Sequence, residues 1–454
     1  MRRFVKASLL AGVAAGFLYT VPAAGQEPLG LPQAVSTALE KNPSVRAATA
    51  IEAQADARVL QARGNYLPKI NYTESLQRGT NPVYVFGSLL TQRQFGPGNF
   101  DVHSLNRPAA LTNFQTQVTV DQMVFDGRQT SLAVKTAGLG RQVAGEERRR
   151  TETETIYAVV RHYYGAALAA ESLRLAAESR KTAEANLRRA EALREAGMTT
   201  DADVLSIRVH LASVEEERIR AANDLQVAQA ALNEVLGVPL DAGHVLTSPL
   251  TQAELPGGAL PQYERTALER RPEAREALLD AQIAGARQQM ARAAYLPQVA
   301  VHGVFETDRQ TFASRGGSNW IVGASLRFNL WNGFSDRARV QESAAALRAA
   351  EAHRERAHSG ILLEVRRAYL DVRAANQRVE VMRAAVAEAE ESLRILQNRY
   401  EAGLANVTEL LRADTALFAA RTRRLAAVYD QRLAAVRLEQ AAGTLGPDSA
   451  VLNP

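Results

Sequence analysis

The chain has 454 residues, a formal net charge of +5 and no cysteine. The absence of cysteine excludes disulfides, a thiolate metal site and a lipid-bearing N-terminal cysteine. Acidic and basic residues alternate as on solvated helix faces, and no clusters of aromatic and basic residues indicate nucleic-acid binding.

Residues 1–25 have the pattern of a signal peptide. Arg2, Arg3 and Lys6 precede a short apolar stretch, and small residues suited to cleavage follow it. This stretch is too short to span a bilayer as a helix, and no later stretch of about 18 apolar residues occurs. We expect an exported protein without a transmembrane helix.

Residues 26–69 predict the helices of a first repeat. One covers residues 31–40, and a second begins at Asn42-Pro43, where proline suits the first helical turn. Gly64 and Pro68 end this helix, because proline cannot continue it.

Residues 70–126 predict a hairpin whose two strands are separated by a loop, residues 79–108, rich in Gly, Pro and Asn. Apolar and polar residues alternate in both strands, and again within residues 298–332. Alternation over about ten residues, with aromatics near the ends, is typical of a membrane β-barrel strand. A half-buried strand of a soluble sheet has the same period. The export signal favours the barrel.

Residues 127–237 predict a long helix and a return helix of a tunnel. The first extends from about residue 130 to 196, a rod on the order of 100 Å long. Gly197 suits the left-handed end of that helix, and Thr200 with Asp203 predicts a capping box for the next.

The second half of the chain repeats this order after an irregular connector, residues 238–261. We expect a helix in 262–297, the hairpin in 298–332 and a long and a return helix in 333–443. The tail, 444–454, is expected to be disordered after Gly446.

Matching motifs support the repeat. Tyr66-Leu67-Pro68 recurs as Tyr295-Leu296-Pro297, and Phe125-Asp126-Gly127 corresponds to Trp331-Asn332-Gly333. The second long helix also has a heptad seam, which predicts close packing against a neighbouring helix. Its positions are Val365, Val372, Val379, Val386, Leu393 and Tyr400.

Four membrane strands per chain leave unpaired edges that lipid cannot satisfy. Eight strands from two chains close, but their interior is filled by side chains. Three chains give twelve strands and an open lumen. The argument favours at least three subunits and leaves four open.

The order and duplication of these motifs resemble the TolC family of outer-membrane efflux channels over essentially the whole mature chain. The resemblance implies a mainly α-helical homotrimer with a twelve-stranded β-barrel in outer-membrane lipid, continued by a long α-helical barrel in the periplasm of a Gram-negative bacterium. It also implies docking of a periplasmic adaptor that couples the tunnel to an inner-membrane pump.

The resemblance places a periplasmic gate at the helix turns, where Asp203, Tyr400 and Glu409 match gate positions. Helix capping alone accounts for Asp203 and Glu409, and Tyr400 is also a seam residue. Ala405 stands where the family has a latch arginine, and Arg412 where it has a second acidic residue.

The two turn glycines, Gly197 and Gly403, are expected to mark adaptor-docking turns, although both also serve as ordinary helix ends. We expect no enzyme and no cofactor, because no phosphate-binding loop or catalytic triad is present. Two alternatives stay open: a type I secretion channel for polypeptides, or a non-channel periplasmic coiled-coil protein such as an adaptor.

Overall fold

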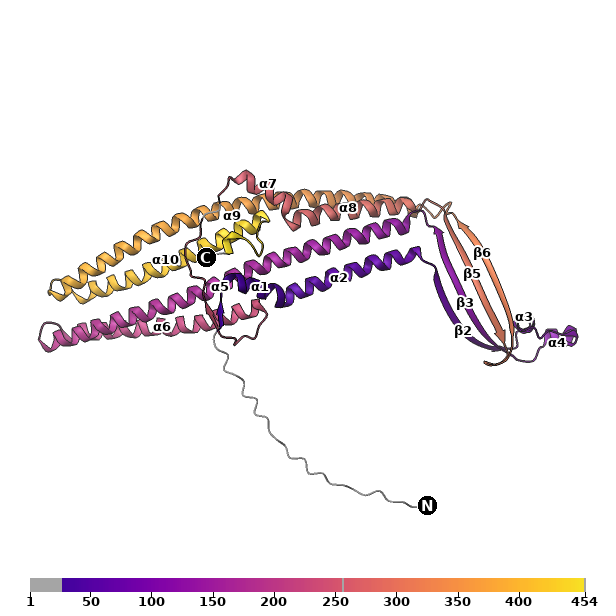
Figure 1. Ribbon diagram of the computed structural model, residues 1–454, viewed down its shortest axis with the longest axis horizontal. Coiled ribbons are helices and arrows are strands. Elements are labelled where there is room, and N and C mark those ends of the chain that lie inside the picture. The colour runs from indigo at the N-terminus through magenta and orange to yellow at the C-terminus, as the bar shows by residue number, and fades with distance from the viewer. Residues whose placement is uncertain (1–26, 255–256, 453–454) are drawn as a thin grey trace, which may run out of the picture.

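The structure is a computed structural model that describes residues 27–254 and 257–452. It is elongated, with paired helices that continue at one end into a four-stranded sheet (Figure 1). The predicted signal peptide, residues 1–25, lies outside the described residues. In the described ranges, no helix has both the length and the apolar character needed to cross a membrane.

Two copies of one arrangement make up the molecule. In each, a long helix of 67 residues is followed by a return helix of 36 residues. The first copy consists of α1 (Leu31–Lys41), α2 (Pro43–Arg63), β2 (Lys69–Gly79), β3 (Leu111–Phe125), α5 (Gln129–Glu195) and α6 (Asp201–Leu236). The second consists of α7 (Leu260–Arg270), α8 (Pro272–Ala293), β5 (Gln298–Arg309), β6 (Gly317–Arg327), α9 (Ser335–Glu401) and α10 (Val407–Ala442).

The heptad seam of α9 is confirmed. Its predicted positions are all buried: Val365, Val372, Val379, Val386, Leu393 and Tyr400. Because these residues repeat every seven positions, they form one apolar stripe along the helix. That stripe packs mainly against α10, so α9 and α10 form one hairpin, and α5 and α6 form the other.

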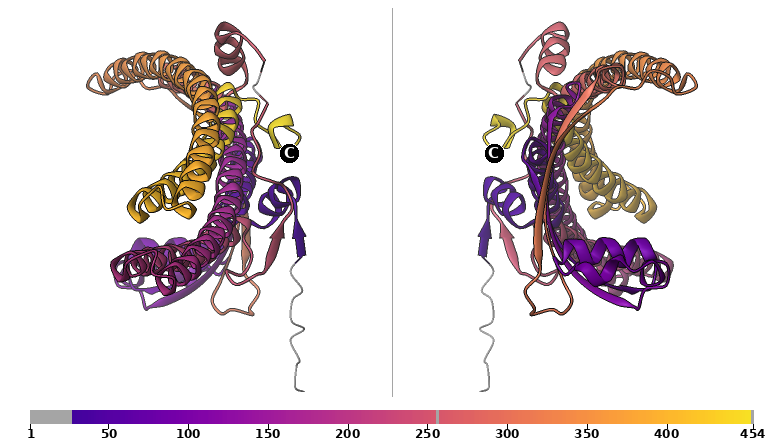
Figure 2. Two further views of the ribbon diagram at one scale, coloured as in Figure 1. Left: turned by 90° about the vertical axis from the view of Figure 1, so that its left-hand side faces the viewer. Right: turned by 90° about the vertical axis from the view of Figure 1, so that its right-hand side faces the viewer.

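The sheet is antiparallel in the order β2-β3-β5-β6. β3 pairs with β5 and so joins the two repeats, with Val118 opposite Phe305. α2, α5, α8 and α9 continue the strands as one curved layer (Figure 2). Within the described chain, β2 and β6 each have a single strand neighbour.

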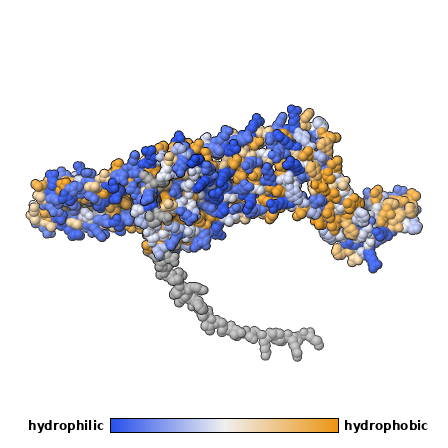
Figure 3. Space-filling model, turned by 45° about the horizontal axis from the view of Figure 1, so that its top comes forward, coloured by the Kyte–Doolittle hydropathy of each residue, from blue (hydrophilic) through white to orange (hydrophobic). Residues whose placement is uncertain are grey.

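The two faces of the sheet differ in polarity. On one face, large apolar side chains are exposed, including Tyr72, Trp320 and Leu326. Figure 3 shows apolar residues gathered over the sheet, whereas the helical part is largely polar. The opposite face carries polar side chains that bond across strands, such as Asn113 Nδ2 donating to Asp308 Oδ1 at 2.6 Å. A soluble sheet would bury its apolar face.

The segment between β2 and β3 is more ordered than expected. Instead of an irregular loop it contains α3 (Pro82–Thr91), a 3-10 turn (Pro97–Phe100) and α4 (Val102–Asn106). The Asn81 side chain caps α3 by accepting a hydrogen bond from the Tyr84 N–H at 3.2 Å. The Gly, Pro and Asn content that indicated a loop therefore includes the start signals of a helix.

Near the middle of the rod, the described part of the connector between α6 and α7 is irregular as expected apart from one short strand, β4 (His244–Leu246), which pairs in parallel with β1 (Glu27–Leu29). The expectation for the tail is wrong. The tail, expected to be disordered, ends in a 3-10 turn (Ala450–Leu452), and Leu452 is only 1% exposed in the central core. The cluster that Leu452 joins is built mainly from residues far away along the chain, such as Leu31 and Ile156, so no local signal reveals this packing.

Candidate functional site at the helix-turn tip

The candidate site is the tip of the rod farthest from the sheet, where the turns of both hairpins lie (Figure 1). Buried apolar residues from all four helices form one cluster there. Its members are Ala190, Val204, Ile207, Leu393, Tyr400, Val407, Leu410, Ala413 and Leu417.

The first turn joins α5 to α6. Gly197 has φ of 71°, the left-handed conformation that glycine adopts without strain. Asp203 Oδ2 accepts hydrogen bonds from the Thr200 hydroxyl at 2.8 Å, the Thr199 hydroxyl at 2.9 Å and the Thr200 N–H at 3.1 Å. These bonds, led by that of the Thr200 hydroxyl, hold the pKa of Asp203 below its usual range. The predicted capping box is confirmed.

The second turn joins α9 to α10 in the same way. Gly403 has φ of 68°. Asn406 Oδ1 accepts a hydrogen bond from the Glu409 N–H at 2.9 Å, and Glu409 Oε2 accepts one from the Asn406 N–H at 3.2 Å. Asn406 and Glu409 therefore form a capping box like that of the first turn, and Glu409 is exposed.

Tyr400 lies in the last turn of α9 and is 8% exposed. Burial raises the pKa of its hydroxyl, and the nearby charge of Asp203 adds to this effect. The Thr199 hydroxyl lies toward it, but the geometry falls short of a hydrogen bond, so the buried Tyr400 hydroxyl has no partner among the described residues. Tyr400 thus touches the first turn by packing.

Two charged contacts connect the hairpins at this end. Arg189 on α5 pairs with Glu401 on α9, with both side chains about half exposed. Farther from the turns, His210 on α6 meets Asp414 on α10, with 2.9 Å between Nε2 and Oδ2. Here both side chains are largely buried, at 15% and 8% exposure.

A family model described as outer membrane efflux protein matches residues 34–238 and 265–444. The chain belongs to the outer membrane efflux protein family. One relative is Protein CyaE of Bordetella pertussis, which is 30% identical over 94% of this chain and 86% of its own length. Another is the pyoverdine export outer membrane protein OpmQ of Pseudomonas putida, 25% identical over 91% of this chain and 85% of its own.

Solved channels have the same fold as this outer membrane efflux protein. The Campylobacter jejuni CmeC outer membrane channel matches with a TM-score of 0.78 at 16% identity, covering 93% of this chain and 87% of that one. The open state of the Neisseria gonorrhoeae MtrE outer membrane channel matches with a TM-score of 0.74 at 18% identity, covering 93% of both chains.

As a member of this family, the protein is an outer-membrane exit channel. The alternative of a non-channel periplasmic coiled-coil protein does not hold. Both efflux and secretion channels are among its relatives, so family membership does not distinguish these two uses.

Within this efflux protein, the three residues predicted for a gate are not all in contact. The structure brings Asp203 and Tyr400 to the first turn, whereas Glu409 bonds within its own cap. Sequence reasoning missed His210 and Asp414. Each lies inside the return helix of a different repeat, and neither has a local motif that indicates the other.

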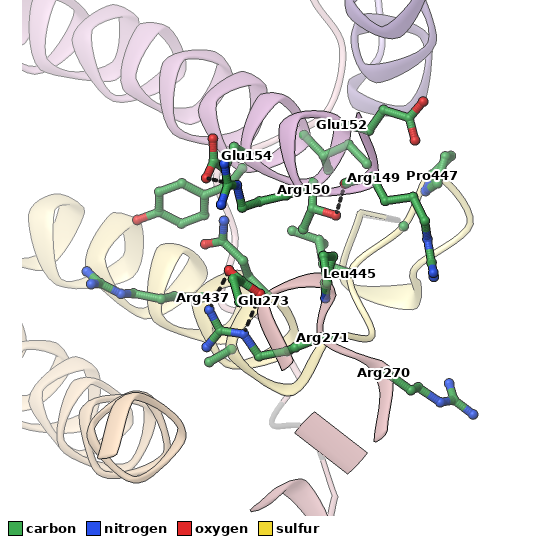
Figure 4. Close-up of a pocket in the computed structure, with 18 of the residues that line it drawn as sticks. Arg149, Arg150, Glu152, Glu154, Arg270, Arg271, Glu273, Arg437, Leu445 and Pro447 are labelled. Carbon is green, nitrogen blue, oxygen red and sulfur yellow. Dashed lines mark hydrogen bonds and ion pairs between the residues drawn. The ribbon is translucent and has the colours of Figure 1, made fainter. Parts of the chain in front are cut away.

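A cavity of about 580 Å³ lies between the two repeats near the middle of the rod (Figure 4). Although arginines line it, its central arginine is neutralised internally: Arg271 donates to Glu273 at 2.8 Å and to Glu364 at 2.5 Å. Arg270 and Arg437 extend away from each other in Figure 4. These side chains do not point toward a common point where a ligand could bind. The cavity lies at the boundary between the repeats and is lined by residues of both.

Proposed function

We propose that three copies of this channel protein join edge to edge into a twelve-stranded barrel in the outer membrane, and that their helices form a continuous periplasmic tunnel. One observation carries the proposal: the sheet exposes an apolar face while the outer edges of β2 and β6 have no strand partner within the described chain. In lipid, those backbone N–H and C=O groups need partners. Identical copies supply them, because β6 of one copy can pair with β2 of the next.

The curvature of the chain supports a closed ring. The sheet and the layer of α2, α5, α8 and α9 bend in the same sense (Figure 2). The polar face of the sheet carries side chains such as Gln115 and Glu306, which bond to each other at 3.2 Å. With the apolar face in lipid, this polar face lines a water-filled lumen.

Cysteine cross-linking tests the edge pairing, because the chain has no natural cysteine. Asn71 on β2 and Ser325 on β6 lie near the helical ends of their strands and on the same polar face. An Asn71→Cys/Ser325→Cys variant should give covalent dimers and trimers on oxidation, but nothing larger. Asn71→Cys alone should give no trimer. A monomer that conducts no ions across a planar bilayer would disprove the proposal.

We place the periplasmic gate at the helix-turn tip. Asp203 and Tyr400 lie together at the first turn, and the shared apolar cluster holds the two hairpins against each other. Glu409 adds an exposed negative charge at the second turn. In a trimer, three such tips converge and narrow the tunnel.

We further propose that a periplasmic adaptor, coupled to an inner-membrane pump, docks on the turns at Gly197 and Gly403. Both glycines face open space: a Cβ atom there meets nothing within 4 Å. The glycines that end the return helices differ. A Cβ on Gly237 would lie 2.6 Å from the Lys41 carbonyl oxygen, and one on Gly443 would lie 3.0 Å from the Arg271 nitrogen. The tip turns are thus free to receive a partner.

The second candidate is polypeptide secretion. The alkaline protease secretion protein AprF of Pseudomonas aeruginosa is 23% identical over 92% of this chain. Replacing either AprF or OpmQ with this protein in its own host distinguishes the two uses. Restored protease secretion supports the second candidate, and restored pyoverdine export supports small-molecule efflux.

A further inference from the structure

His210 and Asp414 form a buried polar contact between the two hairpins. The pair links α6 of the first repeat to α10 of the second at the level of the apolar cluster of the tip, whose members Ala413 and Leu417 flank Asp414 on α10. His210 is the only residue with a described hydrogen bond or ion pair to the Asp414 side chain. A buried carboxylate that loses its partner is costly, so this contact matters more than an exposed one.

Each hairpin is fastened internally by its own ion pairs. In the first, Arg208 pairs with Glu191 at 2.8 Å. In the second, Arg378 pairs with Asp430 at 3.1 Å. The packing of α5 against α6, and of the α9 seam against α10, adds to these ties. If the tip widens, each hairpin therefore stays intact, and the contacts between the two hairpins break.

Three kinds of contact cross between the hairpins at the tip. The apolar cluster is non-directional and tolerates sliding. Arg189 and Glu401 are about half exposed, and such surface pairs contribute little. The contact of His210 with Asp414 is the directional one that is shielded from water. It requires one relative position of α6 and α10.

We propose that His210 and Asp414 form the latch that holds the tip closed, His210 acting as a positioning residue through Asp414. This inference rests on the proposed gate at the tip. In the closed channel, His210 Nε2–H donates to the Asp414 carboxylate. When the hairpins separate, water molecules hydrogen-bond to the His210 imidazole and to the Asp414 carboxylate in place of the contact between them. The latch stands in addition to the contacts of Tyr400 with the first turn.

Single-channel recording from purified protein in planar bilayers tests the latch. His210→Gln and Asp414→Asn should each raise the ratio of open to closed channels, on the order of tenfold for the loss of one buried hydrogen bond. The exchange variant His210→Asp/Asp414→His should return the ratio toward that of the wild type. A residue with only a structural role would show no such recovery.

The matched control is Arg378→Gln/Asp430→Asn, which removes an ion pair involving the same helix, α10, but within one hairpin. It should leave the open ratio unchanged. Single variants that open no more than this control would overturn the latch. Wild-type protein that does not conduct would instead overturn the proposed channel assembly, so the two failures are distinguishable.

A second variant covers the case in which the single substitutions prevent assembly. His210→Cys/Asp414→Cys, in a chain without other cysteines, can be joined by a short bifunctional maleimide. Cross-linked channels should stay closed, and the unlinked variant should open more often than the wild type. Equal conductance before and after linking would also overturn the latch.

Discussion

Arg150 on α5 and Glu276 on α8 form an ion pair across the boundary between the two repeats, with 3.2 Å between Arg150 Nη1 and Glu276 Oε2. The other carboxylate oxygen, Oε1, is buried without a partner among the described residues. Burial raises the pKa of Glu276 to about 7, opposed by Arg150 and reinforced by the neighbouring acids, of which Glu147 contributes most. This carboxyl group therefore titrates near neutral pH.

The first prediction concerns stability and pH. Because the folded-state pKa of Glu276 exceeds its ordinary value of 4.5, the folded protein binds this proton more tightly than the unfolded chain. Its contribution to stability is present below pH 4.5 and is lost as the pH rises through about 7. As the pH rises from 4.5 through about 7, the midpoint temperature of thermal unfolding of Glu276→Gln should increase relative to that of the wild type.

Glu216→Gln is the control, because Glu216 pairs on the surface with Arg220 in the same helix. Its midpoint should follow the wild type at every pH. Parallel curves for the wild type and Glu276→Gln would contradict the prediction.

The second prediction concerns adaptor docking. Leucine at Gly403 is strained by the left-handed backbone, at a cost of roughly 1–2 kcal/mol, but its Cβ meets no atom within 4 Å. We expect Gly403→Leu to assemble normally and to lose pump-dependent export. Gly360→Leu, in open space at ordinary helical φ, is the control and should retain export. Export by a normally assembled Gly403→Leu trimer would refute the docking role.

The third prediction tests the packing of the tail. Leu452 is 1% exposed in the central core, so Leu452→Ala should lower the free energy of unfolding by about 3 kcal/mol. Leu240→Ala, at a side chain that is 61% exposed, should change it by at most about 0.5 kcal/mol. Chemical denaturation measures both, and equal effects would show that the tail is not docked.

The fourth prediction separates packing from hydrogen bonding at Tyr400. Its buried hydroxyl has no partner among the described residues. Tyr400→Phe should therefore preserve the free energy of unfolding and keep the channel closed as in the wild type. Tyr400→Ala should lower the free energy of unfolding by about 3–5 kcal/mol and increase channel opening, because it leaves a cavity between the hairpins. A leaky Tyr400→Phe channel would show that the hydroxyl itself holds the tip.

The sequence alone determined the parts that depend on neighbours a few residues apart. The heptad seam ending at Tyr400 and the capping boxes at Thr200 and Asn406 follow from contacts within one or two helical turns. The duplicated motifs also revealed the repeat, because copying preserves residue order. Local signals overlapped at Asn81-Pro82, where the same residues suit a loop and the start of a helix.

Only the tertiary structure decided which distant segments meet. It paired β3 with β5 across the repeats, buried Leu452 in the central core and brought His210 to Asp414. His210 and Asp414 are 204 residues apart, β3 and β5 belong to different repeats, and the core around Leu452 includes residues of the N-terminal helix α1. Their contacts depend on how whole helices and strands pack in three dimensions, and no local periodicity or spacing records that.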